Sequence, residues 1–131
     1  QVWSFWDVLP TLADLTGQPI PPGLDGVSVL PAWREGRAIA HPPLYWEFHE
    51  RGFDQAARID DWKAVRHGVN KPIELYDLKT DLAERQNVAS AHPDVVAKFD
   101  AYLKSARVPS DLWPIREAPA RKAAAKSASA K

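Results

Sequence analysis

Tyr45 to Gly68 reads YWEFHERGFDQAARIDDWKAVRHG, three short segments of alternating apolar and polar residues separated by turn residues. A period of two is that of an extended strand with one buried face. For the first segment this pattern predicts an apolar face toward the core and a polar display face. The apolar face holds Leu44, Trp46 and Phe48, and the display face holds Tyr45, Glu47 and His49.

The second and third segments predict a hairpin around Asp60-Asp61, although Asp-Asp is a weaker turn signal than Asp-Gly. A two-residue turn pairs Ile59 with Trp62 on the core face and Arg58 with Lys63 on the other. Directly opposed cations lower stability unless an anion lies nearby. That anion is either a ligand or a glutamate of a neighbouring strand, for which the candidates are Glu47, Glu50 and Glu74.

Beyond the hairpin, Ile73 to Leu78 predicts a further strand, so a small antiparallel sheet is expected. Thr80 to Arg85 predicts a short helical turn. The longest helix is expected from His92 to Pro109, and it should cover one face of the sheet. Its apolar stripe consists of Val95, Val96, Phe99, Tyr102 and Leu103.

Before the hairpin, Leu9 to Thr16 predicts a short helix with Pro10 in its first turn. Ser4 and Asp7 have the spacing of a capping box. The apolar residues at helical spacing are Phe5, Val8, Leu12 and Leu15. A one-turn helix is expected in Val27 to Trp33, and the remaining segments read as loops rich in proline.

The expected fold class is therefore α+β: an antiparallel sheet of three to four strands packed against a C-terminal helix, with an N-terminal helix and long proline-rich loops. Four parts are expected along the chain. Residues 1–17 form the N-terminal helix, 18–43 a loop region, 44–108 the sheet with its helix, and 109–131 a disordered tail rich in alanine and lysine.

Composition limits the function. The chain has 131 residues, a formal net charge of zero and no cysteine, which excludes thiolate chemistry and gives no global attraction to nucleic acid or a membrane. No apolar run approaches the roughly 20 residues that span a bilayer. Gln1 opens directly into a helix-like pattern without a leader, so the chain is expected to be a piece of a longer protein. A basic nucleic-acid arm at 116–131 is the less favoured reading of the tail.

Few residues have the spacing of a catalytic or metal site. The four histidines show no pair three or four residues apart, as a zinc site on one helix requires, and no serine lies in a Gly-x-Ser-x-Gly context. From the residues alone, no catalytic or metal-binding residue is expected. The best polar cluster is Glu47 and His49 with the phenol of Tyr45, and an ordinary exposed strand face is the alternative.

Taken in order, these segments resemble the C-terminal part of a sulfatase of the arylsulfatase type, within the alkaline-phosphatase-like superfamily. The segment DVLPTLADLTG at 7–17 resembles the helix that leads out of the family's catalytic domain, and PPGLDGVSVLPAW at 21–33 resembles the following loop. Three further segments resemble the family's C-terminal sheet and its terminal segment: YWEFHE at 45–50, QAARIDDWKAVR at 55–66 and ELYDLKTDLAERQNVA at 74–89. Residues 92–106 resemble the family's closing helix.

Two departures from the family pattern concern turns. Asp60 stands where this family commonly has glycine before the Asp-Trp-Lys of the hairpin, so it must adopt the turn conformation at a higher cost. Asp81-Leu82-Ala83-Glu84 stands where the family often has Asp-Pro-x-Glu, which suggests a more helical turn here.

The resemblance implies that sulfate ester hydrolysis needs residues outside this chain. Such sulfatases convert the first residue of Cys-x-Pro-Ser-Arg, or its serine counterpart, to a formylglycine nucleophile, and this chain has neither motif. Their calcium ion is held by the N-terminal domain, so none is expected to bind here. The resemblance thus implies a C-terminal fragment that is inactive alone, whose partners are the missing N-terminal catalytic domain and a sulfated small molecule or glycan. A periplasmic or extracellular location follows from the resemblance only.

In similar enzymes the C-terminal subdomain forms a wall of the active-site cleft and helps to select the substrate. The resemblance therefore implies substrate contacts on the polar strand face, namely Glu47, His49, Glu50, Gln55 and Arg58. Without its larger partner, the chain should expose an apolar surface around Trp3, Phe5 and Trp6. A free-standing module that binds a carbohydrate or a peptide on the same face is the alternative.

Overall fold

The computed structural model describes residues 1–50 and 52–115. The chain folds into two compact units, Gln1–Leu44 and Tyr45–Lys131, and each is described by itself. In the described part of the chain, the helices are too short or too polar to cross a bilayer. Of the tail expected at 109–131, the structure describes residues 109–115, and 116–131 lie outside the described residues.

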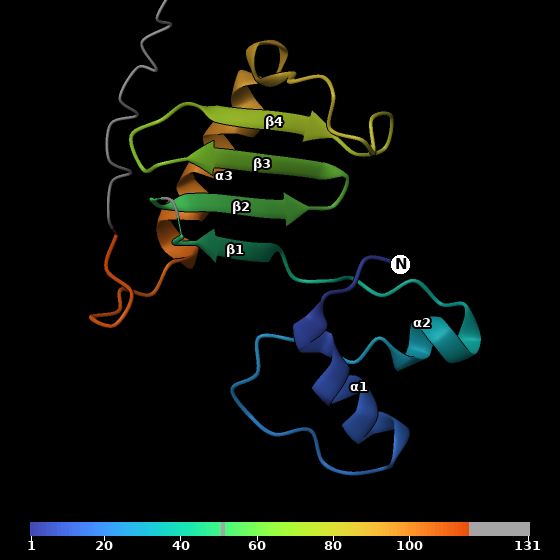
Figure 1. Ribbon diagram of the computed structural model, residues 1–131. Coiled ribbons are helices and arrows are strands. Elements are labelled where there is room, and N and C mark those ends of the chain that lie inside the picture. The colour runs from blue at the N-terminus through green and yellow to red at the C-terminus, as the bar shows by residue number, and fades with distance from the viewer. Residues whose placement is uncertain (51, 116–131) are drawn as a thin grey trace, which may run out of the picture. The chain divides into compact units, whose positions relative to one another are not determined.

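The second unit is a four-stranded antiparallel sheet with a helix across one face (Figure 1). The strands β1 (Leu44–Phe48), β2 (Asp54–Ile59), β3 (Trp62–His67) and β4 (Ile73–Asp77) are neighbours in chain order. A 3₁₀ turn, Ala89–Ala91, precedes α3 (Pro93–Ala106). The expected α+β class, with its sheet, C-terminal helix and N-terminal helix, is confirmed.

The hairpin register is the one that the sequence predicts. Ile59 pairs with Trp62 and Arg58 with Lys63 across β2 and β3. Asp60 takes a left-handed φ of 54°, the conformation that glycine adopts at lower cost. The turn therefore forms in spite of its weak dipeptide signal, because the flanking strands pair along their whole length.

The core of this unit lies between the sheet and α3. It consists of Ala57, Ala64, Ile73, Leu75, Phe99 and Leu103, all buried. Ala57 and Ala64 face each other across the hairpin and have no exposed surface. Their small side chains leave room beneath the helix for Phe99 and Leu103, so the predicted stripe of α3 is the face that packs on the sheet.

The face assignment of β1 is wrong in the sequence prediction. Tyr45, expected on the display face, packs against the core, and its ring lies 6.4 Å from that of Tyr102 on α3. Trp46 and Phe48, expected in the core, are 37% and 51% exposed, whereas Leu44 at the start of the strand is buried as expected. A period of two defines two faces but does not say which one meets the helix.

The expected helical turn between Thr80 and Arg85 is a turn held by a side chain instead. Asp81 Oδ2 accepts hydrogen bonds from the backbone amides of Arg85 and Gln86, at 2.7 and 2.8 Å. Glu84 takes a left-handed φ of 53°, which ends any helical geometry. Asp81 thus satisfies the amides that a helix would otherwise pair.

The first unit contains the 3₁₀ turn Phe5–Asp7, α1 (Val8–Leu15) and α2 (Leu30–Glu35). Asp7 joins them, because its buried carboxylate accepts hydrogen bonds from the amides of Ser4 and Val27, at 2.6 and 2.9 Å. The Thr11 hydroxyl accepts a hydrogen bond from the Val29 amide at 3.0 Å. The face of α1 that is buried therefore carries Pro10 and Thr11.

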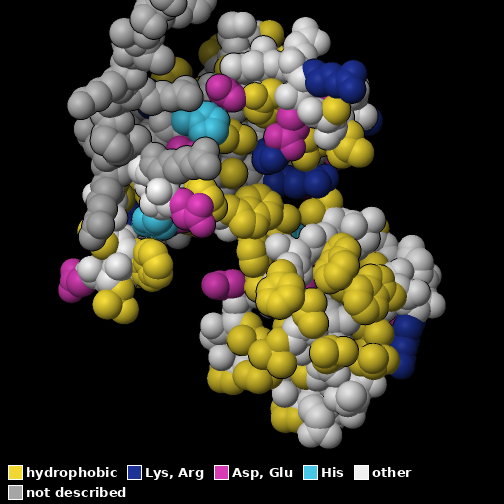
Figure 2. Space-filling model, viewed as in Figure 1, with side chains coloured by type: hydrophobic (Ala, Val, Ile, Leu, Met, Phe, Trp, Pro, Cys, Tyr) yellow, Lys and Arg dark blue, Asp and Glu magenta, His cyan; other side chains and the backbone are white. Residues whose placement is uncertain are grey.

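Three of the apolar residues at helical spacing remain exposed, and the fourth, Val8, is half-buried. Phe5, Leu12 and Leu15 are 86%, 50% and 44% exposed. Figure 2 shows hydrophobic side chains gathered over the part that holds α1 and α2. The spacing predicted a helix correctly, but the hydrogen bonds of Asp7 and Thr11 decided which face is buried.

Candidate functional site

A chain of polar side chains crosses the sheet on the side that faces α3. Gln55 Nε2 donates to the Tyr45 hydroxyl at 2.7 Å and to the backbone oxygen of Leu103 at 3.2 Å. Gln55 Oε1 accepts from Arg66 Nη2 at 2.6 Å, and Arg66 Nη1 donates to Asp100 at 2.9 Å. Buried polar groups that are paired in this way hold one arrangement of strands and helix.

Glu47 lies at the open end of this chain and has three partners. Its Oε1 accepts from the Tyr45 hydroxyl at 2.6 Å, and its Oε2 lies 3.1 Å from His49 Nε2. Arg107 Nε lies 3.4 Å from Oε1, an ion pair that lacks hydrogen-bond geometry, and this buried nitrogen has no hydrogen-bond partner among the described residues. Glu47 thereby orients a phenol, an imidazole and a guanidinium at once.

Tyr45 stays a neutral donor at physiological pH. Burial raises the pKa of its hydroxyl, and the hydrogen bond to the Glu47 carboxylate raises it further, to about 12. The phenol therefore stays protonated near pH 7 and donates its hydrogen bond to Glu47.

A cleft of about 600 Å³ opens beside Glu47. Arg107 and Ser110 contribute to its wall, and its other lining residues are Glu47, Phe48, His49, Glu50, Val108 and Trp113. The His49 ring lies 5.1 Å from the ring of Phe53 and 5.7 Å from that of Trp113. The imidazole is thus fixed between two aromatic rings and the Glu47 carboxylate.

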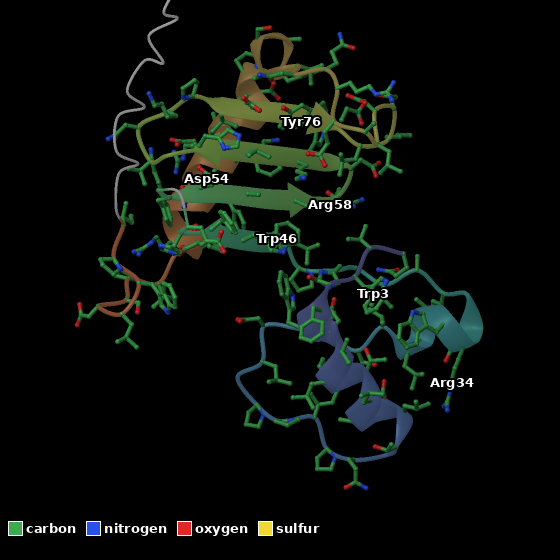
Figure 3. The ribbon with its side chains drawn as sticks, in the orientation of Figure 1. Trp3, Arg34, Trp46, Asp54, Arg58 and Tyr76 are labelled. Carbon is green, nitrogen blue, oxygen red and sulfur yellow. The ribbon has the colours of Figure 1, made fainter. Side chains whose placement is uncertain are left out.

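The structure brings some of the predicted site residues together and separates others. Glu47, His49 and Glu50 line the cleft. Gln55 is 3% exposed and supports Tyr45 from below. Arg58 lies on the opposite face of the sheet at the end of β2 (Figure 3), where its Nε donates to the backbone oxygen of Asp60 at 3.1 Å. An odd and an even position of one strand cannot share a face.

The anion beside the paired cations of the hairpin is Glu84. Lys63 Nζ donates to both of its carboxylate oxygens, at 2.6 and 2.7 Å. The candidates named from the sequence, Glu47, Glu50 and Glu74, do not take this role. Glu84 reaches Lys63 from the turn after β4, and strand alternation gives no information about a loop.

Sequence reasoning missed Arg107 and Trp113. Arg107 follows the last turn of α3, its Nη2 donates to the backbone oxygen of Trp113 at 3.1 Å, and its guanidinium lies 5.6 Å from the Phe53 ring. Trp113 falls in the range expected to be a tail. The usable signal was a tryptophan next to Pro114, with Leu112 and Ile115 beside it, because apolar and aromatic residues at rigid turns are unusual in disordered chain.

The arrangement can bind and orient a ligand with polar groups. Within residues 1–50 and 52–115, no three His, Cys, Asp or Glu side chains converge on a common point where a metal ion could bind. The cleft offers a carboxylate, an imidazole and an aromatic surface, which suits hydrogen bonding and stacking.

No family model matches the chain. Arylsulfatase K of Danio rerio is 36% identical over 111 residues, which cover 78% of this chain and 21% of the relative. Delta 4,5-hexuronate-2-O-sulfatase of Bacteroides thetaiotaomicron is 34% identical over 105 residues, covering 74% of this chain and 22% of the relative. The chain spans about a fifth of the length of the curated relatives that it matches.

The fold is also found in solved structures. One, described as a 2-O GAG sulfatase, has a TM-score of 0.66 and 30% sequence identity, and the match covers 76% of this chain and 23% of that one. The sequence match and the fold match each cover about three quarters of the chain.

Proposed function

This chain belongs to the sulfatases of the arylsulfatase type, and from that premise we propose that it is the C-terminal part of a larger enzyme that hydrolyses sulfate esters. One observation carries the proposal: about three quarters of the chain agree with sulfatases in sequence, at 36% and 34% identity, and a similar share agrees in fold, at a TM-score of 0.66.

The proposal assigns the chemical steps to the rest of the enzyme and substrate binding to this chain. Cleavage of a sulfate ester needs a nucleophile, a cation that neutralises the sulfate oxygens and an acid for the leaving group. In this proposal an N-terminal domain supplies the formylglycine nucleophile and the calcium ion, as the family resemblance implies. Residues 1–17 lead from that domain, and 44–108 form the C-terminal subdomain.

The role proposed for this chain is to bind and orient the substrate. Glu47, His49 and Glu50 line the cleft and are placed to contact a ligand. Gln55 and Tyr45 hold Glu47 from behind. Arg58 belongs to the other face of the sheet, so we assign it no contact in this cleft.

The proposed substrate class is a sulfated carbohydrate. One relative is named Delta 4,5-hexuronate-2-O-sulfatase, and one solved structure is described as a 2-O GAG sulfatase, at 34% and 30% identity to this chain. The hydrogen-bonding groups of the cleft suit a hydroxyl-rich ligand better than a plain aryl ring.

A free-standing carbohydrate-binding module is the second candidate. It is favoured by the fact that the residues lining the cleft all come from the second unit, so that binding there does not require another domain. This candidate differs from the first in one respect that can be tested directly, namely the presence of catalytic residues upstream of Gln1.

The test begins with the coding sequence that precedes Gln1, where we expect a formylglycine motif and an acidic calcium cluster. The longer protein, expressed with formylglycine-generating machinery, should cleave an aryl sulfate or a 2-O-sulfated hexuronate. The 131-residue chain, given calcium and the same substrates, should not. Turnover by the purified chain alone, or a natural chain that starts at Gln1, would contradict the proposal.

His49→Ala in the longer protein tests the proposed role of this chain. It should change the ratio of kcat/KM between substrates more than it changes the melting temperature, because His49 lies at the cleft surface. The matched control is His67→Ala, which alters a histidine at the end of β3 outside the cleft lining. Equal losses for every substrate, with a lowered melting temperature, would show that His49 is structural.

A further inference from the structure

The cleft beside Glu47 has an apolar floor that is open to solvent. Phe48 and Trp113 are 51% and 63% exposed, and Val108 is 83% exposed. Large apolar side chains that line a concave surface gain free energy when a ligand covers them. A ligand for this site therefore has an apolar face of its own.

Trp113 is held in its place before any ligand arrives. Its backbone oxygen accepts from Arg107 Nη2 at 3.1 Å, its backbone amide donates to the Ser110 oxygen at 3.2 Å, and its ring lies 5.7 Å from His49. An aromatic platform that is already ordered loses little entropy on binding. The C–H face of a pyranose is a ligand surface that stacks on such a ring.

The charges of the cleft do not favour an anion. Arg107, the cationic lining residue among those described, already has Glu47 as its counter-ion and Phe53 as its stacking partner. His49 also faces Glu47. Glu50 adds a second, exposed carboxylate. A sulfate or carboxylate entering the cleft would therefore meet a like charge, whereas sugar hydroxyls can donate to a carboxylate.

We propose that this cleft is a subsite for an uncharged pyranose ring, which stacks on Trp113 and donates hydroxyl hydrogen bonds to Glu50 while His49 faces its edge. The inference rests on the proposed function in taking the ligand to be part of a glycan. It goes further in assigning this chain the recognition of a neutral sugar unit and not of the sulfate.

The experiment uses the 131-residue chain, with its folding checked by far-UV circular dichroism. Methyl β-D-glucopyranoside and D-glucuronate are titrated in separate arms, and the indole N–H signals are followed by NMR, with Trp113 assigned by its substitution. We expect the glucoside to shift the Trp113 signal with millimolar affinity and glucuronate to bind at least tenfold more weakly. Tighter binding of glucuronate, or no shift of Trp113 with either sugar, would overturn the proposal.

Variants separate stacking from charge. Trp113→Ala should weaken glucoside binding at least tenfold, and Trp113→Phe should retain part of it. Trp33→Ala, which removes a tryptophan of the first unit that is 54% exposed against 63% for Trp113, should leave it unchanged. Glu50→Gln should raise the affinity for glucuronate. Unchanged binding in Trp113→Ala, or no response of glucuronate binding to Glu50→Gln, would contradict the assignment.

The outcome is independent of the sulfatase assay. Sugar binding measured on this chain would stand even if the longer protein failed to cleave sulfate esters, in which case the binding-module candidate would gain. Cleavage by the longer protein without sugar binding by this chain would remove the subsite alone.

Discussion

At the scale of single residues, the backbone at Gly26 and at Asp60 limits which amino acids those positions accept. Gly26 packs so tightly on the 3₁₀ turn Phe5–Asp7 that an added Cβ would lie 2.1 Å from the Trp6 carbonyl oxygen and 2.9 Å from the Asp7 amide nitrogen. Backbone atoms cannot move aside as a flexible side chain can. This glycine is therefore required by space and not by its φ angle.

We expect Gly26→Ala to lower the free energy of unfolding by about 3 kcal/mol or more, the upper part of the range for overpacking. The measurement is urea denaturation followed by tryptophan fluorescence. Gly23→Ala is the matched control, because its Cβ meets nothing within 4 Å and only its φ of 77° is strained. It should cost about 1 kcal/mol. Equal losses in the two variants would show that the close approach to Trp6 is absent in solution.

Asp60→Gly should stabilise the hairpin by about 0.5–1 kcal/mol, since glycine adopts the left-handed φ of 54° without a Cβ penalty. The gain is measured as a shift of the urea midpoint at constant m-value. Asp61→Gly is the control, because Asp61 has an ordinary φ and glycine there adds only unfolded-state entropy. A loss of stability in Asp60→Gly would mean that the aspartate side chain itself holds the turn.

At the scale of elements, α3 is attached to the hairpin by a polar contact as well as by its apolar stripe. Arg66 on β3 is 6% exposed and bridges Gln55 on β2 and Asp100 on α3. Asp100 also pairs with Lys104 on the exposed side of the helix. The same carboxylate thus takes part in one partly buried and one exposed interaction, so the contributions of the two to the free energy of unfolding can be compared.

Arg66→Ala should cost about 2–3 kcal/mol, because it leaves the buried Gln55 oxygen and one face of Asp100 without a donor. Lys104→Ala should cost about 0.5 kcal/mol or less, as exposed pairs four residues apart on a helix do. The two losses of stability are measured by thermal unfolding of both variants and of the wild type. A larger loss in Lys104→Ala would contradict the burial argument.

Asp7 connects the elements of the first unit and makes its stability depend on pH. Burial alone would raise the pKa of this carboxyl, but the hydrogen bonds from the Val27 and Ser4 amides and from His41 outweigh it and hold the pKa below its ordinary value of 3.8. A depressed folded pKa contributes stability that is present above pH 3.8 and is lost as the pH falls through the folded value.

Between pH 5 and pH 3, wild-type stability should therefore fall more than that of Asp7→Asn, which has no proton to gain. At pH 7 the variant should be less stable by about 1–3 kcal/mol, since its amide nitrogen faces a backbone donor. Hydrogen exchange at the Val27 amide reports this unit specifically. Parallel pH profiles for the two proteins would show that Asp7 does not titrate in this window.

At the scale of the whole molecule, the first unit leaves much of its apolar surface uncovered. Trp3 and Phe5 are 48% and 86% exposed, as the sequence led us to expect, whereas Trp6, expected with them, is half-buried. Leu12, Leu15 and Trp33 add to the exposed apolar surface. A contiguous apolar surface of this kind is covered by a partner in stable proteins. The proposed function supplies that partner as the rest of the enzyme.

The isolated chain should consequently self-associate in sedimentation velocity as its concentration rises from micromolar to near millimolar. Replacing Trp3 and Phe5 together with serine should weaken the association at least tenfold. Leu112→Ser removes an equally exposed apolar side chain from the second unit and should have little effect. A chain that stays monomeric over this range would argue against an uncovered docking surface.

Local sequence determined the elements and the family of this protein. The alternation around Asp60-Asp61 predicts the β2–β3 register residue by residue, and the stripe of α3 predicts the face that meets the sheet. Both follow from short-range periodicity, which is the information that a single sequence carries most reliably. The ordered segments from 7 to 106 were sufficient to recognise a sulfatase.

Only the tertiary structure decided which face of β1 meets α3, which glutamate neutralises Lys63 and which residues complete the cleft. Each of these depends on contacts between segments distant in sequence: Tyr45 with Tyr102, Lys63 with Glu84, and His49 with Trp113. Periodicity does not identify such pairs, because it defines the faces of an element but not the segment that packs on each face.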